Sequence, residues 1–571
     1  MRRLARHHGI ALDYEGRKVP DRTLALILQG LGQDPQGDPV GPPAPQRMSV
    51  PGRTRCHVPP SLTEAPGWGV FCQLYELRSN RGWGIGDFSD LAALARICGA
   101  AGADFLGVNP VHALFTALPE RASPFSPSNR RFLNPLYIAP DLLGAERPAM
   151  QDGDHVDYPA VARAKLGALR RVFDSCRPDA DFDDFVAQGG YALHQHALFE
   201  ALSHHHGGGW QDWPVPFHDP HSAAVADFAR RNRPDVQFHL WLQWIARQQL
   251  HAAQQAAKDA GMRVGLYLDL AVGEALDGSA TWSGTAVSLP DLTIGAPPDM
   301  FSEDGQNWQL AAPSPVALRE TDFAPYRAMI AAQLQDAGAL RIDHAMALWQ
   351  LFLIPRDAPA AAGAHLRFPL ADMLRVLAEA SQSHRALIIG EDLGFVPDGF
   401  RDSMQKAGVL SYRIVYFEKS AEGFAPAETY PQLALACLST HDLPPLTGWW
   451  DGIDIDLREA HGLVSKATSR AHRDQRLAER KQLARALDVA APDADALLDA
   501  AHRFIAATPS VLAGVRLADL VGPARPTNLP GVTDGYPNWK PRSPVSIDQI
   551  AAHPRFARIA RIMRHARPRP Q

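Results

Sequence analysis

Four acidic side chains in this sequence share one local setting, because each directly follows an apolar run. They are Asp269, Asp343, Glu391 and Asp442. Ionisable side chains rarely lie near a core unless they are paired or used in chemistry. Taken alone, the polar positions of "GALRIDHAMAL" fit a strand end at which Asp343 caps the next turn. Four acids in the same setting favour a shared catalytic site over four separate caps.

Grouped carboxylates with a nearby cation suit the cleavage of a glycosidic bond. In a retaining reaction one carboxylate attacks the anomeric carbon and a protonated one donates to the leaving oxygen, at a separation of about 5–5.5 Å. Arg341 lies two residues before Asp343, on the same face of a strand, and can keep that acid ionised. Tryptophans would offer stacking faces for sugar rings or would fill the core: Trp83, Trp210, Trp213, Trp282 and Trp308.

Eight short apolar runs are the candidate strands that would position these acids. They begin near residues 69, 103, 263, 339, 386, 410, 433 and 511, and helical patterns lie between them. Strands that alternate with helices predict a parallel sheet, and eight such units fit an α/β fold of the TIM (β/α)8 barrel type. The four acids would then lie at the C-terminal ends of strands, which converge on one mouth of the barrel.

The chain divides into three parts by composition. Residues 1–32 read as a short helical N-terminal segment, and residues 33–60 are rich in Pro and Gly and read as a linker. Residues 61–571 would form the catalytic barrel. Large loop insertions at its C-terminal face would span about 140–235 and 275–325.

The overall composition is that of an ordinary globular enzyme. The 571 residues are 46% hydrophobic and 21% charged, and the net charge of -5 gives no argument for nucleic acid or a membrane surface as a partner. The five cysteines are widely spaced and suit a reducing compartment. The basic N-terminus lacks the apolar middle of a signal peptide, and no run is long enough to span a bilayer. We therefore expect a cytoplasmic protein.

Other motifs have weaker functional interpretations. "SHHHGGGW" from residue 203 invites a metal site, but three consecutive histidines do not readily face one ion. The basic amphipathic stretch "RFARIARIMRHARP" near the C-terminus would bind an acidic partner or, as is more common, dock on the barrel. "GIGDF" lacks the spacing of a phosphate loop, and no GxSxG nucleophile motif is present.

Several segments resemble the 4-alpha-glucanotransferases, also called amylomaltases or disproportionating enzymes, of the alpha-amylase clan. In chain order they are "QLYELRSNRGWGIGDFSDL", "SPFSPSNRRFLNPLYI", "GLYLDLAVG", "GQNW", "LRIDHAMAL", "IGEDLGFVPDGF", "STHDLPPLTGWW" and "NLPGVTDGYPNW". The resemblance extends from about residue 66 onward, and "STHDLP" is more similar to the bacterial maltodextrin-system branch than to the plant-like branch.

The resemblance implies roles for the acids. Asp343 matches the nucleophile, Glu391 the general acid/base, and Asp442 the third carboxylate, which holds sugar hydroxyls. His441 precedes Asp442 and would bind substrate beside it.

It also implies supporting residues. Arg341 and Asp269 match residues that support the site where the bond is cut. Asn307 and Trp308, in a "GQNW" loop, match a flexible segment that covers bound glucan.

Two departures from the family pattern stand out. Relatives of this branch usually have a larger, strand-rich N-terminal region, whereas here a short helical segment and a linker precede the barrel. Many relatives have Tyr where this chain has Phe125, so one hydroxyl contact to substrate would be missing.

The resulting hypothesis is a retaining alpha-1,4-glucan transferase without a metal or organic cofactor. It would move a maltodextrin segment from a donor to the 4-hydroxyl of an acceptor glucose or maltooligosaccharide. A hydrolase of the same clan and a non-catalytic glucan-binding protein are the alternatives. All three acids are present, which argues against the binding protein.

Overall fold

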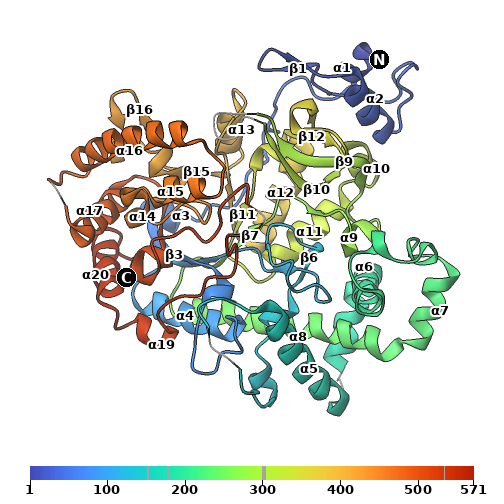
Figure 1. The fold of residues 1–571 in the computed structure, drawn as a ribbon, viewed down its shortest axis with the longest axis horizontal. Coiled ribbons are helices and arrows are strands. Elements are labelled where there is room, and N and C mark those ends of the chain that lie inside the picture. The colour runs from blue at the N-terminus through green and yellow to red at the C-terminus, as the bar shows by residue number, and fades with distance from the viewer. Residues whose placement is uncertain (151–152, 177–179, 299–303, 491, 533, 571) are drawn as a thin grey trace.

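A closed barrel of parallel strands forms the centre of the molecule (Figure 1). The computed structural model describes residues 1–570 apart from 151–152, 177–179, 299–303, 491 and 533. The barrel order is β11-β14-β15-β18-β19-β3-β4-β7. Its strands are β3 (Gly67–Cys72), β4 (Phe105–Val108), β7 (Gly265–Leu270), β11 (Ala339–Ile342), β14 (Leu387–Gly390), β15 (Leu410–Ile414), β18 (Ala434–Cys437) and β19 (Leu512–Arg516). Each of the eight predicted runs supplies one strand, and the TIM-barrel prediction is confirmed.

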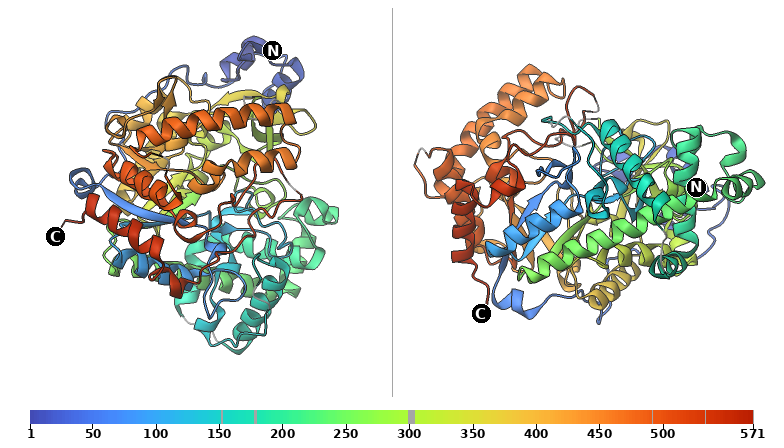
Figure 2. Two further views of the ribbon diagram at one scale, coloured as in Figure 1. Left: turned by 60° about the vertical axis from the view of Figure 1, so that its left-hand side comes forward. Right: turned by 90° about the horizontal axis from the view of Figure 1, so that it is seen from below.

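Burial on both faces explains why these strands read as continuous apolar runs. Every residue of β4, β11, β14 and β18 is buried, as expected where side chains fill the barrel on one face and helices cover the other. The outer helices include α4 (Phe88–Ala100), α8 (Arg233–Asp259), α11 (Ala324–Leu334), α12 (Leu370–His384), α13 (Phe400–Lys406), α17 (Ala494–Ala507), α18 (Leu517–Val521) and α19 (Ile547–Ile550). Helices α4 and α8 lie side by side on the barrel (Figure 2).

A second sheet stands over one side of the barrel mouth and is built from two separate barrel loops. Its order is β13-β12-β9-β10-β8. The loop after β7 supplies β8 (Glu274–Ala275), β9 (Ser288–Ala296) and β10 (Gln306–Pro313), and the loop after β11 supplies β12 (Gln350–Pro355) and β13 (Ala364–Arg367). The contribution of residues 350–367 was not anticipated from sequence. We call these five strands the mouth sheet.

Helical insertions flank the barrel on both sides (Figure 1). On the side of the mouth sheet lie β5 (His112–Ala113), β6 (Asn129–Leu133), α5 (Tyr158–Ser175), α6 (Ala180–His206), α7 (Ala223–Arg231), α9 (Ser279–Trp282) and α10 (Pro315–Glu320). On the opposite side lie α14 (Leu446–Asp451), α15 (Ile453–Ala460), α16 (Lys466–Ala486), β16 (Lys419–Ser420) and β17 (Gly423–Phe424). Helix α6 is interrupted at Gly190, whose φ of 54° is not helical.

The two ends of the chain pack on different parts of the fold. The N-terminal segment comprises α1 (Arg2–His7), β1 (Asp13–Tyr14), β2 (Arg17–Lys18) and α2 (Asp21–Gly30), and it lies against the mouth sheet (Figure 2). Residues 31–59 contain no helix or strand, and α3 (Pro60–Glu64) then leads into β3. The basic helix α20 (Pro554–Ala566) buries Phe556, Ile559 and Met563 against α17, so docking on the barrel domain is confirmed. None of the helices in the described ranges has the length and apolar content needed to cross a bilayer.

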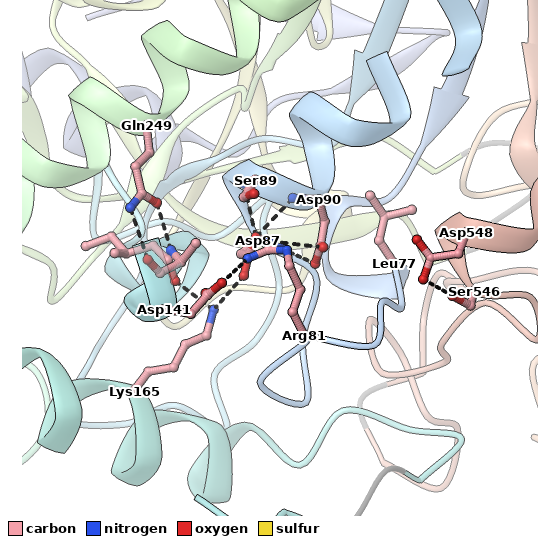
Figure 3. Close-up of polar contacts among 12 residues, drawn as sticks. Leu77, Arg81, Asp87, Ser89, Asp90, Asp141, Lys165, Gln249, Ser546 and Asp548 are labelled. Carbon is pink, nitrogen blue, oxygen red and sulfur yellow. Dashed lines mark hydrogen bonds and ion pairs between the residues drawn. The ribbon is translucent and has the colours of Figure 1, made fainter. Parts of the chain in front are cut away.

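A buried lysine joins the helical insertion to the start of α4 (Figure 3). Lys165 of α5 is fully buried, and its ammonium group donates to the carbonyl oxygens of Leu136 and Ile138 at 2.8 Å each. The same ammonium lies 3.8 Å from a carboxylate oxygen of Asp87. Burial lowers the pKa of Lys165, but Asp87 and other carboxylates oppose that shift. Two carbonyl oxygens and a carboxylate thus surround the Lys165 ammonium group.

Asp87 is also the N-cap of α4, and a second cation holds it from the other side (Figure 3). Its carboxylate accepts from the backbone N–H groups of Ser89 and Asp90 at 3.0 Å each. Arg81 donates to Asp87 at 2.7 Å, to Asp90 at 3.2 Å and to Asp141 at 2.7 Å. Burial raises the pKa of Asp90 to about 6, with a further increase from Asp87. The loop after β3, the start of α4 and the insertion are therefore fixed by one ionic cluster.

We predict that Lys165→Met lowers the free energy of unfolding by about 2–4 kcal/mol, because it removes the donor to two buried carbonyl groups and leaves Arg81 as the cation beside Asp87. Urea unfolding measures the change. Arg230→Met is the matched control, since it removes an ion pair in which Arg230 is 76% exposed, and we expect it to cost less than about 1 kcal/mol. A Lys165→Met protein as stable as the control would show that the buried ammonium does not hold α5 in place.

Candidate active site

Barrel geometry brings the four predicted acids to one mouth. Asp269 is the penultimate residue of β7, and Asp343 and Glu391 directly follow β11 and β14. These three strands are neighbours in the barrel. Asp442 lies five residues after β18, which is separated from β14 by β15. The acids therefore line two sides of one opening.

Arg341 joins two of the acids. One terminal nitrogen donates to both carboxylate oxygens of Asp269, at 2.7 and 2.9 Å, and the other lies 2.8 Å from Asp343. Arg341 pairs in register with Asp269 on β7, so the strand pairing itself sets this contact. Burial raises the pKa of Asp269 to about 6 although Arg341 opposes the shift. The guanidinium is the positive charge shared by the buried Asp269 and the partly exposed Asp343.

Glu391 has a different set of partners. Its carboxylate oxygens accept from the backbone N–H groups of His344 at 2.8 Å and Leu393 at 2.7 Å. Burial raises the pKa of Glu391 to about 7; Arg341 opposes that shift and Asp343 adds to it. Glu391 is thus a carboxyl group that can hold a proton near neutral pH, next to a carboxylate that is paired with an arginine. Two acids with such different environments can divide the roles of acid and nucleophile.

Asp442 is ionised and faces the opening. Its side chain is 43% exposed and lies 3.2 Å from Nε2 of His441, and Asn528 donates to it at 2.6 Å. Burial acts to raise the pKa of Asp442, but His441 and Asn528 outweigh it and lower that pKa to about 2. A charged, partly exposed carboxylate of this kind can accept hydrogen bonds from sugar hydroxyls.

Phe125 fixes the ring of His441. The two rings stack at 4.6 Å with an interplanar angle of 19°, and Trp539 packs against both. The hydroxyl of Thr527 donates to the carbonyl oxygen of His441 at 3.1 Å. Phe125, the residue that departs from the family pattern, therefore packs against the site with its aromatic face.

Trp308 and Asn307 lie on a strand, whereas we expected a flexible loop. From Gln306 onward the segment belongs to β10, and residues 299–303 before it fall outside the described residues. The pairing of β10 with β9 shifts register between Asn307 and Leu310, so Trp308 lies in a bulge. Bulges redirect side chains beside active sites. The Trp308 ring meets the ring of His344 at 5.3 Å and 79°, next to Asp343.

Most of the other tryptophans belong to the core. Trp83, Trp213 and Trp282 are buried, and Trp210 donates its indole N–H to Thr281 within the helical insertion. The three buried rings offer no open face for a sugar. His204, one of the three consecutive histidines, bonds through Nε2 to the Thr116 hydroxyl at 2.9 Å. This contact gives no support to a metal site.

Three contributors to the site were not singled out from sequence. Asn528 and Trp539 lie within or at the end of "NLPGVTDGYPNW", a segment that carried the family resemblance, so that resemblance was the available signal. Asp392 follows Glu391 and accepts from the Ser411 hydroxyl at 2.5 Å and from the Tyr412 N–H at 3.0 Å. The sequence position of Asp392 beside Glu391 does not indicate its role, which is to anchor the loop after β14 to β15.

Two cavities adjoin the acids, and they differ in chemistry. A small cavity of about 40 Å³ is lined by polar groups that include Asp269, Arg341 and His441. A larger one, of about 520 Å³, is mainly apolar and reaches the acids at Asp343 alone. Of the four acids, Asp269 lines the small cavity and Asp343 the large one, so the reacting groups lie between a polar and an apolar surface.

Comparison with known proteins gives the family. Residues 72–546 match the family model described as 4-alpha-glucanotransferase (glycoside hydrolase family 77). The chain belongs to that family. This membership favours a transferase over the hydrolase and the binding protein. A 4-alpha-glucanotransferase of Mycobacterium tuberculosis (strain ATCC 25618 / H37Rv) is 36% identical over 552 residues, which cover 89% of this chain and 76% of the relative. One from Haemophilus influenzae is 34% identical over 530 residues, with 84% and 76% covered.

Solved structures agree with the assignment to the 4-alpha-glucanotransferase family. The amylomaltase of Corynebacterium glutamicum superposes with a TM-score of 0.85 at 28% identity, covering 99% of this chain and all of that one. The amylomaltase of Streptococcus agalactiae in complex with acarbose superposes with a TM-score of 0.73 at 19% identity, covering 88% and 99%. The second likeness supports the fold alone.

We predict that Arg341→Met destabilises this 4-alpha-glucanotransferase more at pH 8 than at pH 5.5. The pKa of Asp269 is already raised from 3.8 to about 6, so the folded chain binds more protons than the unfolded chain between those values, and stability falls as pH rises. Loss of the guanidinium would raise that pKa further and extend the fall. The loss at pH 8 should reach about 3–5 kcal/mol.

Urea unfolding at the two pH values tests this prediction. Arg327→Met is the control, because its ion pair with Glu379 is half-exposed and should cost no more than about 1 kcal/mol, without added pH dependence. An equal loss at pH 5.5 and pH 8 for Arg341→Met would contradict the proposed charge pairing.

Proposed function

We propose that this chain is a retaining alpha-1,4-glucan transferase that uses Asp343 as nucleophile and Glu391 as general acid/base. The observation that carries the proposal is the contrast between the two groups. Asp343 pairs with the Arg341 guanidinium at 2.8 Å, whereas burial raises the pKa of Glu391 to about 7. A retaining glycosidic reaction needs one ionised and one protonated carboxyl group.

In the first step Asp343 attacks the anomeric carbon of the donor, and Glu391 gives its proton to the leaving glycosidic oxygen. A covalent glucosyl-enzyme and a shortened glucan with a free 4-hydroxyl result. Arg341 pairs with the attacking carboxylate of Asp343, and the backbone N–H groups of His344 and Leu393 hold the Glu391 carboxyl in place. In the second step Glu391 accepts a proton from the 4-hydroxyl of the acceptor, which attacks the anomeric carbon and frees Asp343.

Asp442 and His441 would hold hydroxyl groups of the reacting sugar. The carboxylate of Asp442 stays ionised, and Nε2 of His441 lies beside it. Asn528 and Phe125 act as positioning residues, because they contact Asp442 and His441 respectively. No step of this scheme requires a cofactor.

Trp308 and Asn307 would cover the bound glucan. Water is in great excess over any sugar acceptor, so transfer requires that the glucosyl-enzyme be shielded until the acceptor binds. The Trp308 ring lies over His344, the residue after Asp343, and offers an apolar face to the sugar.

The substrates in this proposal are maltooligosaccharides and glucans derived from starch or glycogen. A family relative of similar fold binds acarbose, an oligosaccharide analogue. We place the enzyme in the cytoplasm, which the buried thiols of Cys72, Cys98 and Cys437 support, because thiols persist in a reducing compartment.

Incubation with pure maltotriose tests the activity. Transfer yields glucose together with a ladder of longer maltodextrins. Glucose and maltose without longer products would indicate a hydrolase, and unchanged maltotriose would indicate a binding protein.

Substitution of the two acids should separate their roles. We expect Asp343→Asn and Glu391→Gln each to lower turnover of maltotriose by about three orders of magnitude, with folding intact. A glucosyl fluoride needs little acid assistance, so glucosyl-enzyme should accumulate in Glu391→Gln and be absent in Asp343→Asn, as mass spectrometry of the intact protein would detect. Glu379→Gln, an exposed acid on α12, is the control. Near-normal turnover by either variant would refute the assignment.

The pH dependence of kcat/KM should report Glu391. The first step needs its protonated form, and its pKa is raised from 4.5 to about 7, so kcat/KM for maltotriose should fall as pH rises through about 7. Glu391→Gln assayed with glucosyl fluoride should lack this alkaline decline. A decline that persists unchanged in Glu391→Gln would assign it to another group.

A further inference from the structure

The N-terminal segment extends the mouth sheet beyond its edge strand. Ile10 forms an antiparallel bridge with Leu366 of β13, and the N–H of Arg367 donates to the carbonyl oxygen of Gly9 at 3.0 Å. Helix α2 packs on β9 of the same sheet. The segment therefore lies beside β9, β12 and β13, far from the opposite barrel wall (Figures 1 and 2).

Two hydroxyl groups of this segment bind one short turn of the mouth sheet. Tyr14 donates to the carbonyl oxygen of Ala361 at 2.6 Å, and Thr23 donates to that of Ala362 at 2.7 Å. Both side chains are buried, and the turn lies between β12 and β13. The Tyr14 ring also packs edge-on against Phe352 of β12 at 5.3 Å. Buried hydroxyl-to-carbonyl bonds fix the turn because water cannot replace the donors.

The fixed turn lies directly against the start of β10. A Cβ atom on Gly305 would lie 3.0 Å from the Cβ of Ala360 and 2.8 Å from the carbonyl oxygen of Ala296, and the φ of Gly305 is +75°. Only glycine fits this close approach without strain. Residue 305 is therefore held between β9 and the turn that Tyr14 and Thr23 hold.

Trp308 lies three residues after Gly305, so the position of Gly305 limits where Trp308 can lie. Gln306 accepts from the Trp308 indole N–H at 3.1 Å, and Asn307 accepts from the N–H of Gln309 at 3.0 Å. Gln309 has a φ of 57°, an unusual value that keeps the bulge in one shape. The indole ring then rests on His344 at 5.3 Å.

We infer that the N-terminal segment is a positioning element for Trp308, with Tyr14 and Thr23 as its positioning residues. By holding the turn at residues 360–362, they hold the start of β10 and so keep the Trp308 ring over the reacting sugar. The inference rests on the proposed transfer reaction and on the covering role of Trp308. The N-terminal segment would then influence whether an acceptor sugar or water attacks the glucosyl-enzyme.

The variants Tyr14→Phe and Thr23→Val each remove one donor and keep the size of the side chain. In the double variant we expect the ratio of hydrolysis to transfer from maltotriose to rise about three- to tenfold, as expected when a bound state loses one or two buried hydrogen bonds. The acceptor KM should rise, while kcat for cleavage of the donor stays within about twofold, because neither residue touches Asp343 or Glu391.

Two matched controls separate positioning from general loss of stability. Thr23→Ser retains the hydroxyl and should keep the wild-type ratio. Arg3→Ala removes an exposed ion pair with Asp38 in the same segment and should also keep it. Thermal unfolding of every variant is measured beside activity, and the single variants are used if the double variant unfolds.

A double-mutant cycle with Trp308→Ala tests the route of the effect. Trp308→Ala alone should raise the ratio, and the Tyr14 and Thr23 substitutions should add nothing in that background. A wild-type ratio in the Tyr14→Phe/Thr23→Val protein, or an equal rise with and without Trp308, would overturn the inference. Failure of the proposed function itself is distinct, because the wild-type protein would then give no longer maltodextrins from maltotriose.

Discussion

A carboxylate that is withdrawn from water remains ionised only when a cation or several N–H groups face it, and at this barrel mouth Arg341 supplies that charge. Its guanidinium contacts Asp269 and Asp343 at 2.7–2.9 Å, and the register of β7 and β11 sets the Asp269 contact. Burial already raises the pKa of Asp269 to about 6, and loss of the guanidinium would raise that pKa further. The guanidinium that contacts the candidate nucleophile is therefore held in place by a strand pairing of the rigid barrel.

Glu391 shows what the same burial does where no cation is in direct contact. Two backbone N–H groups orient its carboxyl, but burial dominates and raises its pKa to about 7. Neighbouring strands are thus followed by two carboxyl groups with different partners, an arginine for Asp343 and two backbone N–H groups for Glu391. On the far side of the opening, His441 and Asn528 keep Asp442 ionised.

The sequence was sufficient for those features that depend on local pattern. Eight apolar runs predicted the barrel, since strands buried on both faces have little polar content, and the acids at their ends indicated the mouth. The mouth sheet could not be predicted the same way, because β12 and β9 come from different barrel loops and pair across 50 or more residues. Because this long-range pairing is not visible in the sequence, Trp308 was expected on a loop and not on β10. Asn528 and Trp539 belong to a segment whose described residues form no helix or strand, so no sequence periodicity or motif spacing indicated them.

His344 contacts both Glu391, the candidate acid, and Trp308, which would cover the bound glucan. Its φ of 49° and ψ of 59° are left-handed values that are uncommon for a side chain of this size, and they let its N–H face Glu391 while its ring meets Trp308. It also directly follows Asp343. A shift of that backbone would therefore move the support of the Trp308 ring. The orientation of the acid and the place of the cover thus depend on one residue with an unusual backbone conformation.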